Sequence, residues 1–587
     1  MSVFNLSDKM SKIYDESNKI KSSPSRIMSI LDFDERVLNM AYDTDTPILE
    51  RINFIKIVSS NLDEFISIKY SECNDSLMIK TYQKIEDLYQ TMENLLCQLR
   101  EEFNIVFGYD NTEMQDKCSI EDEGLYMIYL DEQAEFHIAP YVTSAEKTIE
   151  RIHSMGCDKV MYSFLVRFIS DKTFEYTYAG EDDYTVLQEI EALTLAKGDL
   201  AIKYIQTTCT SDDIMEEFIH FLDIGELTIF HTGVNTIRLS RLTTSMACDE
   251  KYGLYQKLDI GYELYDYSKE LLNRDILFRT PYESYDHVLD FIDQMCTSNS
   301  IETIFMTMYR VKANSKIVQS LIKAKQSGKK VFVYVEVTAR GNEELNRDII
   351  KILMDNKIQV LCTCHNVKVH AKMFCAVDKS GMIYTHISTG NYSESNARIY
   401  TDFQLLTTNK LITKPVMLTF VQLFTDNIMQ LDKYQTSDFA LSPIGLRTIL
   451  LNEIYKETMK GKSGRILIKC NSLCDPQIIS RLYQASECGV KIKIICRTGC
   501  SIKPTENIEI ISKVGRFLQH DRFYIFGEDA YISSADMLTR NLDKRIEAIC
   551  RITDSSLIQK MFDEFIKIWN DPKVYHLSND GWYIKET

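Results

Sequence analysis

The sequence predicts a multidomain α/β protein with an N-terminal helical domain, a middle α+β domain and two tandem α/β domains. The chain has 587 residues, which is enough for several domains of roughly 100–200 residues each. From about residue 275 onward, apolar strands alternate with amphipathic helices, and the same order of elements then occurs a second time. We place the four domains at residues 1–120, 121–272, 273–436 and 437–587.

Helical periodicity is typical of the first hundred residues. Thr46 and Pro47 form a cap and first-turn pair, and Glu50 places a negative charge near the start of the predicted helix. Apolar residues recur at helical spacing at Ile48, Ile52, Ile55 and Val58. A second long helix is predicted over 79–103. Between 125 and 265, short β-branched and aromatic runs alternate with acidic helical stretches, which indicates an α+β domain.

The C-terminal half contains an internal duplication. Strands are predicted over 301–309, 329–337, 358–364 and 367–377, with helices over 315–328 and 343–356. Residues 464–473, 475–489, 490–497 and 515–526 then repeat the order strand, helix, strand and strand. Gly328 and Gly489 end the corresponding helices of the two copies.

Charge is distributed unevenly along the chain. The net charge is −18, which by itself argues against a protein that binds polyanions. Residues 1–300 hold 27 basic and 55 acidic side chains, a net charge of −28, whereas residues 301–587 hold 40 and 30, a net charge of +10. The C-terminal half is therefore the part suited to anionic ligands.

Cysteine usage and hydropathy predict a cytoplasmic protein. The 16 cysteines include no CxxC pair, and a chain of this length is not a disulfide-framed miniprotein. The closely spaced cysteines lie in or beside apolar strands, so we expect buried thiols rather than metal ligands. No segment approaches the roughly 18 apolar residues of a membrane span, so no transmembrane segment is expected.

Each copy of the duplication contains a histidine, a basic residue two positions later, and a Thr and an Asn at fixed distances. The sets are His370, Lys372, Thr389 and Asn391 in the first copy, and His520, Arg522, Thr539 and Asn541 in the second. In both, the Thr lies 19 and the Asn 21 residues after the histidine. Residues two apart on a strand share a face, so each histidine is expected beside its basic neighbour. A lone histidine on an apolar strand is more often a hydrogen-bonded core residue, and the repetition of the set argues against that here.

These side chains suit phosphoryl transfer. A neutral imidazole can attack phosphorus to give a phosphohistidine, while Lys and Arg neutralise the phosphoryl oxygens. The second imidazole can protonate the leaving oxygen or receive its proton. The chain has no GxxxxGK[ST] segment, so nucleotide binding of the P-loop kind is not expected.

The duplicated pattern of histidine, base and asparagine resembles the phospholipase D-like superfamily. That superfamily's motif has an Asp five residues after the Lys, where this chain has Val377 and Gly527. The nearest acids, Asp378 and Glu528, come one residue later. On this ground we expect hydrolysis of a diester less than phosphoryl transfer.

Longer segments are similar to the bacterial polyphosphate kinase family. They include LDFDERVLNMAYDTDTPILERINFIKIVSSNLDEFISIKY, TPYESYDHVLDFI, VEVTARGNEE, VKVHAKMFCAV, HISTGNYSESNARIYTDFQLLT, GRFLQHDRFYIF and SSADMLTRNLDKRIE. The similarity covers about 25–75 and nearly all of 275–575, and it is weak over about 120–265. It implies two phospholipase D-like α/β domains and reversible transfer of the terminal phosphate of ATP to inorganic polyphosphate.

The resemblance also implies catalytic roles for single residues. His370 in VKVHAK matches the phosphorylated histidine, and Lys372 and Asn391 are expected to act with it. His520 in FLQHDR matches a second active-site histidine that contacts nucleotide. His386 in YTHISTGN matches an additional active-site histidine, which we expect to support His370.

Ligand contacts follow from the same resemblance. Asn61, Tyr400 and Arg497 match nucleotide-binding positions, and Arg310 and Arg340 match magnesium-site positions. A guanidinium has no lone pair to offer a cation, so we expect both arginines to clamp phosphate beside Mg²⁺.

The expected ligands are therefore Mg²⁺, ATP or ADP, and inorganic polyphosphate. The resemblance further implies a homo-oligomer (dimer or tetramer), a partner in the RNA-degradation machinery, and a cytoplasmic bacterial protein that can lie peripheral to the membrane. Two alternatives stay open. One is a phospholipase D-like phosphodiesterase or nuclease, and the other is a catalytically decayed scaffold that binds polyphosphate or RNA.

Overall fold

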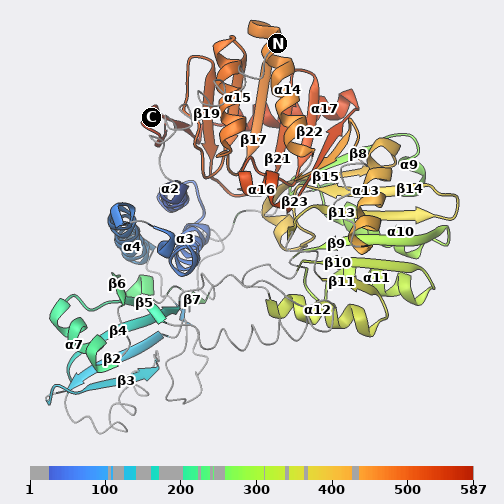
Figure 1. Cartoon of the computed structure of the whole chain (residues 1–587). Coiled ribbons are helices and arrows are strands. Elements are labelled where there is room, and N and C mark those ends of the chain that lie inside the picture. The colour runs from blue at the N-terminus through green and yellow to red at the C-terminus, as the bar shows by residue number, and fades with distance from the viewer. Residues whose placement is uncertain are drawn as a thin grey trace, which may run out of the picture. The chain divides into compact units, whose positions relative to one another are not determined.

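The fold was examined in a computed structural model of the chain. It describes residues 26–73, 75–103, 108–109, 125–131, 133–140, 160–170, 202–222, 227–237, 239, 242–243, 255, 258, 260–309, 311–336, 343–362, 368–425, 435–443 and 445–585. The chain divides into two compact units, of which one contains residues 30–176 and 195–257 and the other contains residues 258–587. The predicted multidomain α/β class is confirmed, and Figure 1 shows the elements in chain order.

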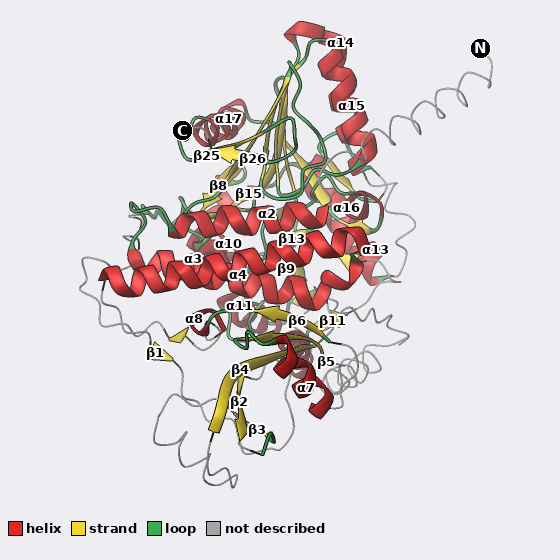
Figure 2. Ribbon diagram, turned by 90° about the vertical axis from the view of Figure 1, so that its left-hand side faces the viewer, coloured by secondary structure: helices red, strands yellow, loops and turns green. Residues whose placement is uncertain are grey.

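The N-terminal unit combines long helices with an open sheet. Its helices are α2 (Arg26–Leu38), α3 (Ile48–Ile68), α4 (Asp75–Phe103), α7 (Asp212–Leu222) and α8 (Val234–Ile237). Its main sheet has the order β3-β2-β4-β5-β6, formed by β2 (Leu125–Asp131), β3 (Phe136–Pro140), β4 (Val160–Ser170), β5 (Ile202–Thr207) and β6 (Thr228–His231). Figure 2 shows α3 and α4 side by side, and Tyr82 of α4 donates a hydrogen bond to the Ile229 carbonyl of β6 at 2.9 Å.

Two further strands complete the described part of this unit. β1 (Gly108–Tyr109) pairs with β7 (Leu242–Thr243) in an antiparallel ladder. Helices α3 and α4 confirm the two predicted N-terminal helices. The start predicted at Thr46 and Pro47 is also confirmed, because α3 begins at the residue after Pro47.

The first α/β domain of the second unit is a mixed sheet with helices. Its strands are β8 (Ile276–Thr280), β9 (Ile301–Met308), β10 (Lys330–Val335), β11 (Gln359–Leu361), β12 (Lys368–Val369), β13 (Lys372–Asp378), β14 (Ile383–Ser388) and β15 (Tyr400–Thr407). Its helices are α9 (Tyr267–Glu270), α10 (Asp286–Thr297), α11 (Lys316–Gln326), α12 (Glu343–Asp355) and α13 (Lys410–Phe424).

The second α/β domain repeats this design. Its strands are β16 (Phe439–Leu441), β17 (Arg465–Cys470), β18 (Lys491–Cys496), β19 (Ile508–Lys513), β20 (Leu518–Gln519), β21 (Arg522–Phe526), β22 (Asp529–Ser533), β23 (Arg545–Ile546), β24 (Ala548–Ile552), β25 (Val574–Leu577) and β26 (Tyr583–Lys585). Its helices are α14 (Leu446–Lys460), α15 (Pro476–Glu487), α16 (Thr539–Asp543) and α17 (Ser555–Trp569).

The strand orders confirm the internal duplication. The first sheet runs β11-β10-β9-β13-β14-β15 with β8 beside β15, and the second runs β19-β18-β17-β21-β22-β24-β16. In each, three parallel strands adjoin antiparallel ones. Because the order and direction of the strands agree, residues on corresponding strands of the two copies can be matched through the strand register.

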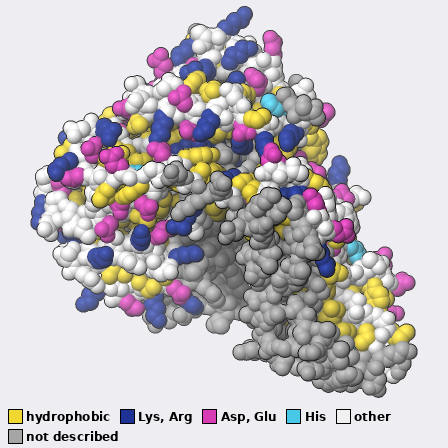
Figure 3. Space-filling model, turned by 180° about the vertical axis from the view of Figure 1, so that it is seen from behind, with side chains coloured by type: hydrophobic (Ala, Val, Ile, Leu, Met, Phe, Trp, Pro, Cys, Tyr) yellow, Lys and Arg dark blue, Asp and Glu magenta, His cyan; other side chains and the backbone are white. Residues whose placement is uncertain are grey.

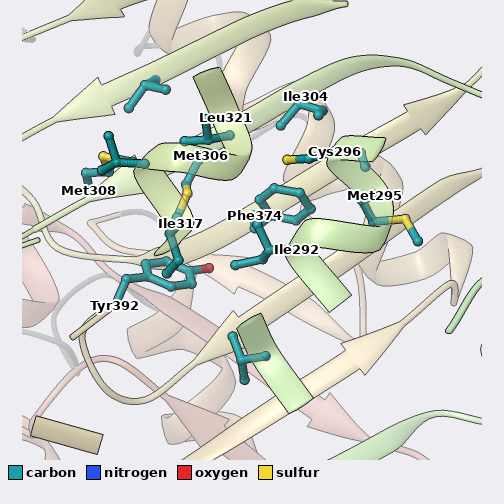
Figure 4. Close-up of a cluster of buried hydrophobic side chains, with 14 of the residues drawn as sticks. Ile292, Met295, Cys296, Ile304, Met306, Met308, Ile317, Leu321, Phe374 and Tyr392 are labelled. Carbon is teal, nitrogen blue, oxygen red and sulfur yellow. The ribbon is translucent and has the colours of Figure 1, made fainter. Parts of the chain in front are cut away.

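Buried apolar side chains hold each sheet to its helices. Figure 4 shows part of the core of the first domain, where Phe374 of β13 lies near Ile292 of α10 and Met306 of β9. These three side chains are fully buried. The apolar residues that predicted the strands thus form the core between the sheet and its helices. Within the described residues, no helix combines the length and apolar character needed to cross a membrane.

Helix ends provide a test of the duplicated backbone. Gly328 and Gly489 have φ angles of +88° and +91° after α11 and α15. A Cβ is strained in this region, so we expect Gly328→Ala and Gly489→Ala each to lower the free energy of unfolding by about 1 kcal/mol. Gly261→Ala is the control, because its Cβ would meet nothing within 4 Å and its φ is not positive. Urea unfolding measures the losses, and equal stability of all three variants would contradict this reading.

Candidate active site

Both site histidines lie at a break in a strand rather than within one. The predicted strand 367–377 divides into β12 and β13, and His370 and Ala371 both donate their backbone N–H to the Ile546 carbonyl, at 2.8 and 2.9 Å. The predicted strand within 515–526 divides in the same way into β20 and β21. A carbonyl that accepts two successive N–H groups interrupts a regular ladder, which explains the first break.

The two short strands cross between the domains. β12 of the first domain pairs in parallel with β23 of the second, and β20 of the second pairs in parallel with the start of β15 of the first. Each histidine follows directly after its short strand. The site is therefore formed where the two copies meet.

Each histidine is hydrogen-bonded to a carboxylate of the other copy. His370 Nδ1 lies 2.9 Å from Glu547 Oε2, and His520 Nδ1 lies 2.9 and 3.0 Å from the two carboxylate oxygens of Asp402. An ionised carboxylate can only accept, so each Nδ1 carries the proton and each Nε2 keeps its lone pair. The described residues form no hydrogen bond to His370 Nε2, which leaves that nitrogen available as a nucleophile.

A hydroxyl group holds each carboxylate in place. Thr389 Oγ1 donates to Asp402 Oδ1 at 2.6 Å, and Ser534 Oγ donates to Glu547 Oε2 at 2.6 Å. Both carboxylates are buried. The two halves therefore share one arrangement of hydroxyl, carboxylate and imidazole.

A buried cation follows each histidine. Lys372 Nζ donates to the His370 carbonyl at 2.5 Å, and Arg522 Nη1 donates to the His520 carbonyl at 2.9 Å. Arg522 Nη1 also lies 3.1 Å from His520 Nε2 and 3.3 Å from the Thr389 carbonyl of the first domain. Each basic residue thus contacts the backbone of the histidine two positions before it, and Arg522 connects the two copies.

Burial and positive charge keep both imidazoles neutral. Burial, followed by the nearby Lys372 and Arg545, lowers the pKa of His370 well below its ordinary value. Burial also lowers the pKa of His520 to about 4, although Asp402 acts in the opposite direction. Burial lowers the pKa of Lys372 well below its ordinary value as well. A bound anion would relieve the mutual repulsion of these cations, so the site favours anionic ligands.

The predicted correspondence of Thr and Asn between the copies is wrong for the second copy. Lys372 pairs with Ser388, and Arg522 pairs with Ser533, so the counterparts of Thr389 and Asn391 are Ser534 and Asp536. Because 16 residues separate the first pair and 11 the second, the equal spacings of 19 and 21 residues are coincidental.

The residues predicted at these spacings have other contacts. Thr539 and Asn541 lie in α16, where Thr539 Oγ1 donates to Asp475 at 2.9 Å and Asn541 Oδ1 accepts the Asp536 N–H at 3.1 Å. Asp536 itself accepts hydrogen bonds from Arg522 Nε and Nη2, at 3.3 and 3.2 Å.

His386 and Asn391 belong to the first domain beside the site. His386 is fully buried in β14, and its ring nitrogens lie 2.8 Å from Tyr392 Oη and 3.0 Å from Gln404 Oε1. It therefore makes no direct hydrogen bond to His370, and its supporting role stays a prediction. Asn391 Oδ1 is buried and has no hydrogen-bond partner among the described residues.

The predicted nucleotide contacts fall in both units. The Tyr400 ring lies 5.3 Å from the His520 ring at the start of β15. Arg497 directly follows β18, and its pKa is lowered to about 10 by burial and by Arg522. Asn61 belongs to the N-terminal unit, where its Nδ2 donates to the buried Asp34 at 2.7 Å. Arg310 and Arg340 lie outside the described residues.

Sequence reasoning missed the two carboxylates and the residues that hold them. Asp402 and Glu547 each stand near the start of a strand that is otherwise largely apolar, in TDFQLLT and IEAICRI. An acidic residue at the same place in both copies was the available signal. Their partners are not adjacent in sequence, so only the strand register identifies which histidine each one contacts.

The described residues of the site do not fit a directly coordinated Mg²⁺. Asp402, Glu547 and Asp536 already accept hydrogen bonds from the site's own imidazole, hydroxyl and guanidinium groups. Among the described residues, the one cluster of three or more His, Cys, Asp or Glu side chains with their ligand atoms close together is Asp131, Glu135 and His137 of the N-terminal unit. The cations at the active site suit phosphate oxygens instead.

The neutral state of His520 can be tested by titration. We expect its ring to stay uncharged from pH 8 down to about pH 5, because its pKa lies at about 4. Histidine in the unfolded chain binds a proton near pH 6.5, so this group's contribution to stability is complete above that pH and falls by about 1.4 kcal/mol per pH unit toward pH 4. NMR of ¹⁵N-histidine-labelled protein, assigned with His520→Ala, measures the titration, and charging between pH 6 and 7 would contradict it.

Comparisons with known proteins agree with this architecture. Models of the polyphosphate kinase N-terminal domain, C-terminal domain 1 and C-terminal domain 2 match residues 24–119, 266–428 and 439–587. A polyphosphate kinase of Staphylococcus saprophyticus is 30% identical, over 92% of this chain and 87% of the relative, and one of Staphylococcus epidermidis is 29% identical, over 92% and 85%. The crystal structure of polyphosphate kinase from Porphyromonas gingivalis matches with a TM-score of 0.74 and 22% identity, over 96% of this chain and 95% of that one, which shows a common fold. The chain belongs to the polyphosphate kinase family.

Proposed function

We propose that this chain is a polyphosphate kinase that transfers the terminal phosphate of ATP reversibly to inorganic polyphosphate through a phosphohistidine on His370. The observation that carries the proposal is the His370–Glu547 hydrogen bond of 2.9 Å, which leaves Nε2 unprotonated. Family membership supports the choice of substrates. The positive C-terminal half is consistent with anionic ligands on both sides of the reaction.

The first step forms the phosphoenzyme. His370 Nε2 donates its lone pair to the terminal phosphorus of ATP, a P–N bond forms, and the bond to the bridging oxygen breaks so that ADP leaves with its electron pair. Glu547 holds the Nδ1 proton and stabilises the positive charge that develops on the imidazole. In the second step, a terminal oxygen of polyphosphate attacks the same phosphorus and forms a P–O bond. The P–N bond breaks with its electron pair returning to Nε2, which restores the neutral imidazole.

His520 is proposed to handle the proton of the leaving or entering oxygen. Its pKa of about 4 in the free site would rise when polyphosphate or nucleotide brings negative charge close to the ring. Arg522 contacts the same imidazole and is placed to neutralise phosphoryl oxygens. Lys372 is proposed to supply a further cation beside His370, and Asn391, whose buried Oδ1 has no partner among the described residues, is proposed to supply a carboxamide.

Nucleotide binding is proposed at Asn61, Tyr400, Arg497 and His520. The 5.3 Å separation of the Tyr400 and His520 rings supports a common surface for part of the nucleotide. Mg²⁺ is proposed to enter bound to phosphate oxygens and water, with Arg310 and Arg340 as phosphate clamps, because the described carboxylates are occupied. No step of the mechanism is assigned to the metal.

The positions of the missing phospholipase D motif acid lie away from the site histidines. Val377 lies five residues after Lys372, near the far end of β13, where it pairs with Ile383. Gly527 follows the far end of β21, and a Cβ there would meet Glu457 rather than a site residue. A diesterase is therefore disfavoured by family membership and not by these positions, and the intact site disfavours the decayed scaffold.

Assembly, partners and location are also proposed from the family resemblance. They are the homo-oligomer (dimer or tetramer), a partner in the RNA-degradation machinery, and a cytoplasmic location that can be peripheral to the membrane. Domain boundaries at 120, 272 and 436 also remain predictions. Analytical ultracentrifugation of the purified chain measures the oligomeric state directly.

Replacement of the proposed nucleophile tests the reaction. His370→Ala is expected to abolish both the acid-labile label from [γ-³²P]ATP and polymer synthesis, because no other described site nitrogen is placed as its substitute. His520→Ala is expected to keep some phosphoenzyme and to lose turnover. His576→Ala, on β25 between β19 and β26, is the matched control. Acid-labile label on the His370→Ala protein would refute the assignment, and diester cleavage without ATP would support the phosphodiesterase.

Removal of the charge beside His370 tests its orientation. Glu547→Gln is expected to slow phosphoenzyme formation by about 10–100-fold, because a carboxamide no longer fixes the Nδ1 proton as an ion does. Ser534→Ala should have a smaller effect, since it keeps the carboxylate. Rapid-quench measurement of label incorporation gives the rates. A folded Glu547→Gln protein with the wild-type rate would be inconsistent with the proposed role.

A further inference from the structure

A buried cluster of charged side chains lies directly beside His520. Asp521 is fully buried, its Oδ2 accepts a hydrogen bond from Arg279 Nε at 3.1 Å, and its Oδ1 accepts one from Lys469 Nζ. Arg279 Nη1 also donates to Glu564 of α17 at 2.5 Å. We call Arg279, Lys469, Asp521 and Glu564 the Asp521 cluster.

Stability alone does not account for this cluster. Burial lowers the pKa of Lys469 to about 8, and Arg279 Nη2 is buried with no hydrogen-bond partner among the described residues. Although burial by itself would raise it, Lys469 and Arg279 hold the pKa of Asp521 well below its usual range. Buried ion pairs often contribute less to stability than well-packed apolar side chains of similar volume.

Thr401 joins the cluster to His520. Thr401 Oγ1 donates to Asp521 Oδ1 at 2.5 Å and accepts the His520 backbone N–H at 3.1 Å. Because ionised Asp521 can only accept, it fixes the direction of the Thr401 hydroxyl. Thr401 stands between Tyr400 and Asp402, two residues of the first domain that contact the His520 ring.

The first copy has the same strand arrangement but uncharged side chains at the positions of this cluster. The residues corresponding to Asp521, Lys469, Arg279 and Thr401 are Ala371, Thr307, Leu441 and Ile546. There the backbone N–H of His370 is held by a carbonyl instead of a hydroxyl. The duplicated fold therefore does not require these charges. They occur beside His520 and not beside His370, the proposed nucleophile.

We infer that Asp521 is a positioning residue for the proton-handling histidine, and that it acts through Thr401 to hold the backbone of His520 so that the ring stays on Asp402. The inference rests on the proposed function, which gives His520 a task different from that of His370. Arg279 on β8 belongs to the first domain, and Lys469 on β17 belongs to the second. The cluster thus joins the two domains beside His520, whose ring contacts residues of both domains.

The chain itself supplies the variant that separates positioning from stability. Arg279→Leu/Lys469→Thr/Asp521→Ala installs the uncharged residues of the first copy. We expect this triple variant to keep the wild-type melting temperature within a few degrees, to lower kcat for polymer synthesis by about 10-fold or more, and to change KM for ATP by less than about twofold. If the cluster served stability alone, the triple variant would have the wild-type melting temperature and also the wild-type kcat. This result would overturn the inference.

Thr401 provides a second test that leaves the cations paired. Thr401→Val removes the hydroxyl at similar volume and is expected to lower kcat by about 10-fold, whereas Thr401→Ser is expected to keep it. Lys330→Met/Glu302→Gln is the control, because it removes an exposed ion pair of the first domain, at 3.1 Å, and leaves the contacts of the Asp521 cluster in place. Equal kcat in the Val and Ser variants would also overturn the inference, even if the triple variant does not fold.

An NMR readout separates this inference from the proposed function. In ¹⁵N-histidine-labelled protein without ligands, the His520 ring is expected to be a single Nδ1–H tautomer in the wild type and in Thr401→Ser, and a mixture of tautomers in Thr401→Val and the triple variant. Unchanged tautomers in all four proteins would contradict the positioning role. Failure of the proposed function has a different signature, namely a wild-type protein that takes no label from [γ-³²P]ATP.

Discussion

The active site depends on one constraint, which is that neither histidine finds its carboxylate in its own copy of the duplicated domain. His370 is oriented by Glu547 of the second copy, and His520 by Asp402 of the first. The exchange of the short strands β12 and β20 makes both contacts possible at once. A displacement of one domain against the other would therefore disturb both imidazoles together, and the interdomain contacts serve chemistry as well as stability.

Much of this site follows from the sequence, because the duplication repeats the chemical groups at matching places. The strands, the helices between them, and the pairs His370–Lys372 and His520–Arg522 were predictable from periodicity and spacing. Asp402 and Glu547 were not, since each becomes a partner only through pairing between strands of different copies. The counterparts of Thr389 and Asn391 were also misassigned in the second copy, because the two hairpins differ in length by five residues.

The two histidines have similar carboxylate partners but different charged groups around them. His370 has a free Nε2 and is surrounded by cations that lower its pKa, whereas His520 has Arg522 on Nε2 and the Asp521 cluster beside it. The net charge of −18 conceals this local excess of positive groups. Figure 3 shows basic and acidic side chains interspersed over the described surface of one face. The charged groups that contact the two histidines are instead buried.

The nitrogen that becomes phosphorylated tests the account most directly. Because Glu547 holds the Nδ1 proton of His370, phosphorus should attach to Nε2. Proton–phosphorus correlation NMR of the phosphoenzyme formed from ATP distinguishes the two ring positions, and peptide mass spectrometry identifies the residue. The account predicts Nε2-phosphohistidine at position 370, and phosphorus on Nδ1, or on a residue other than His370, would contradict it.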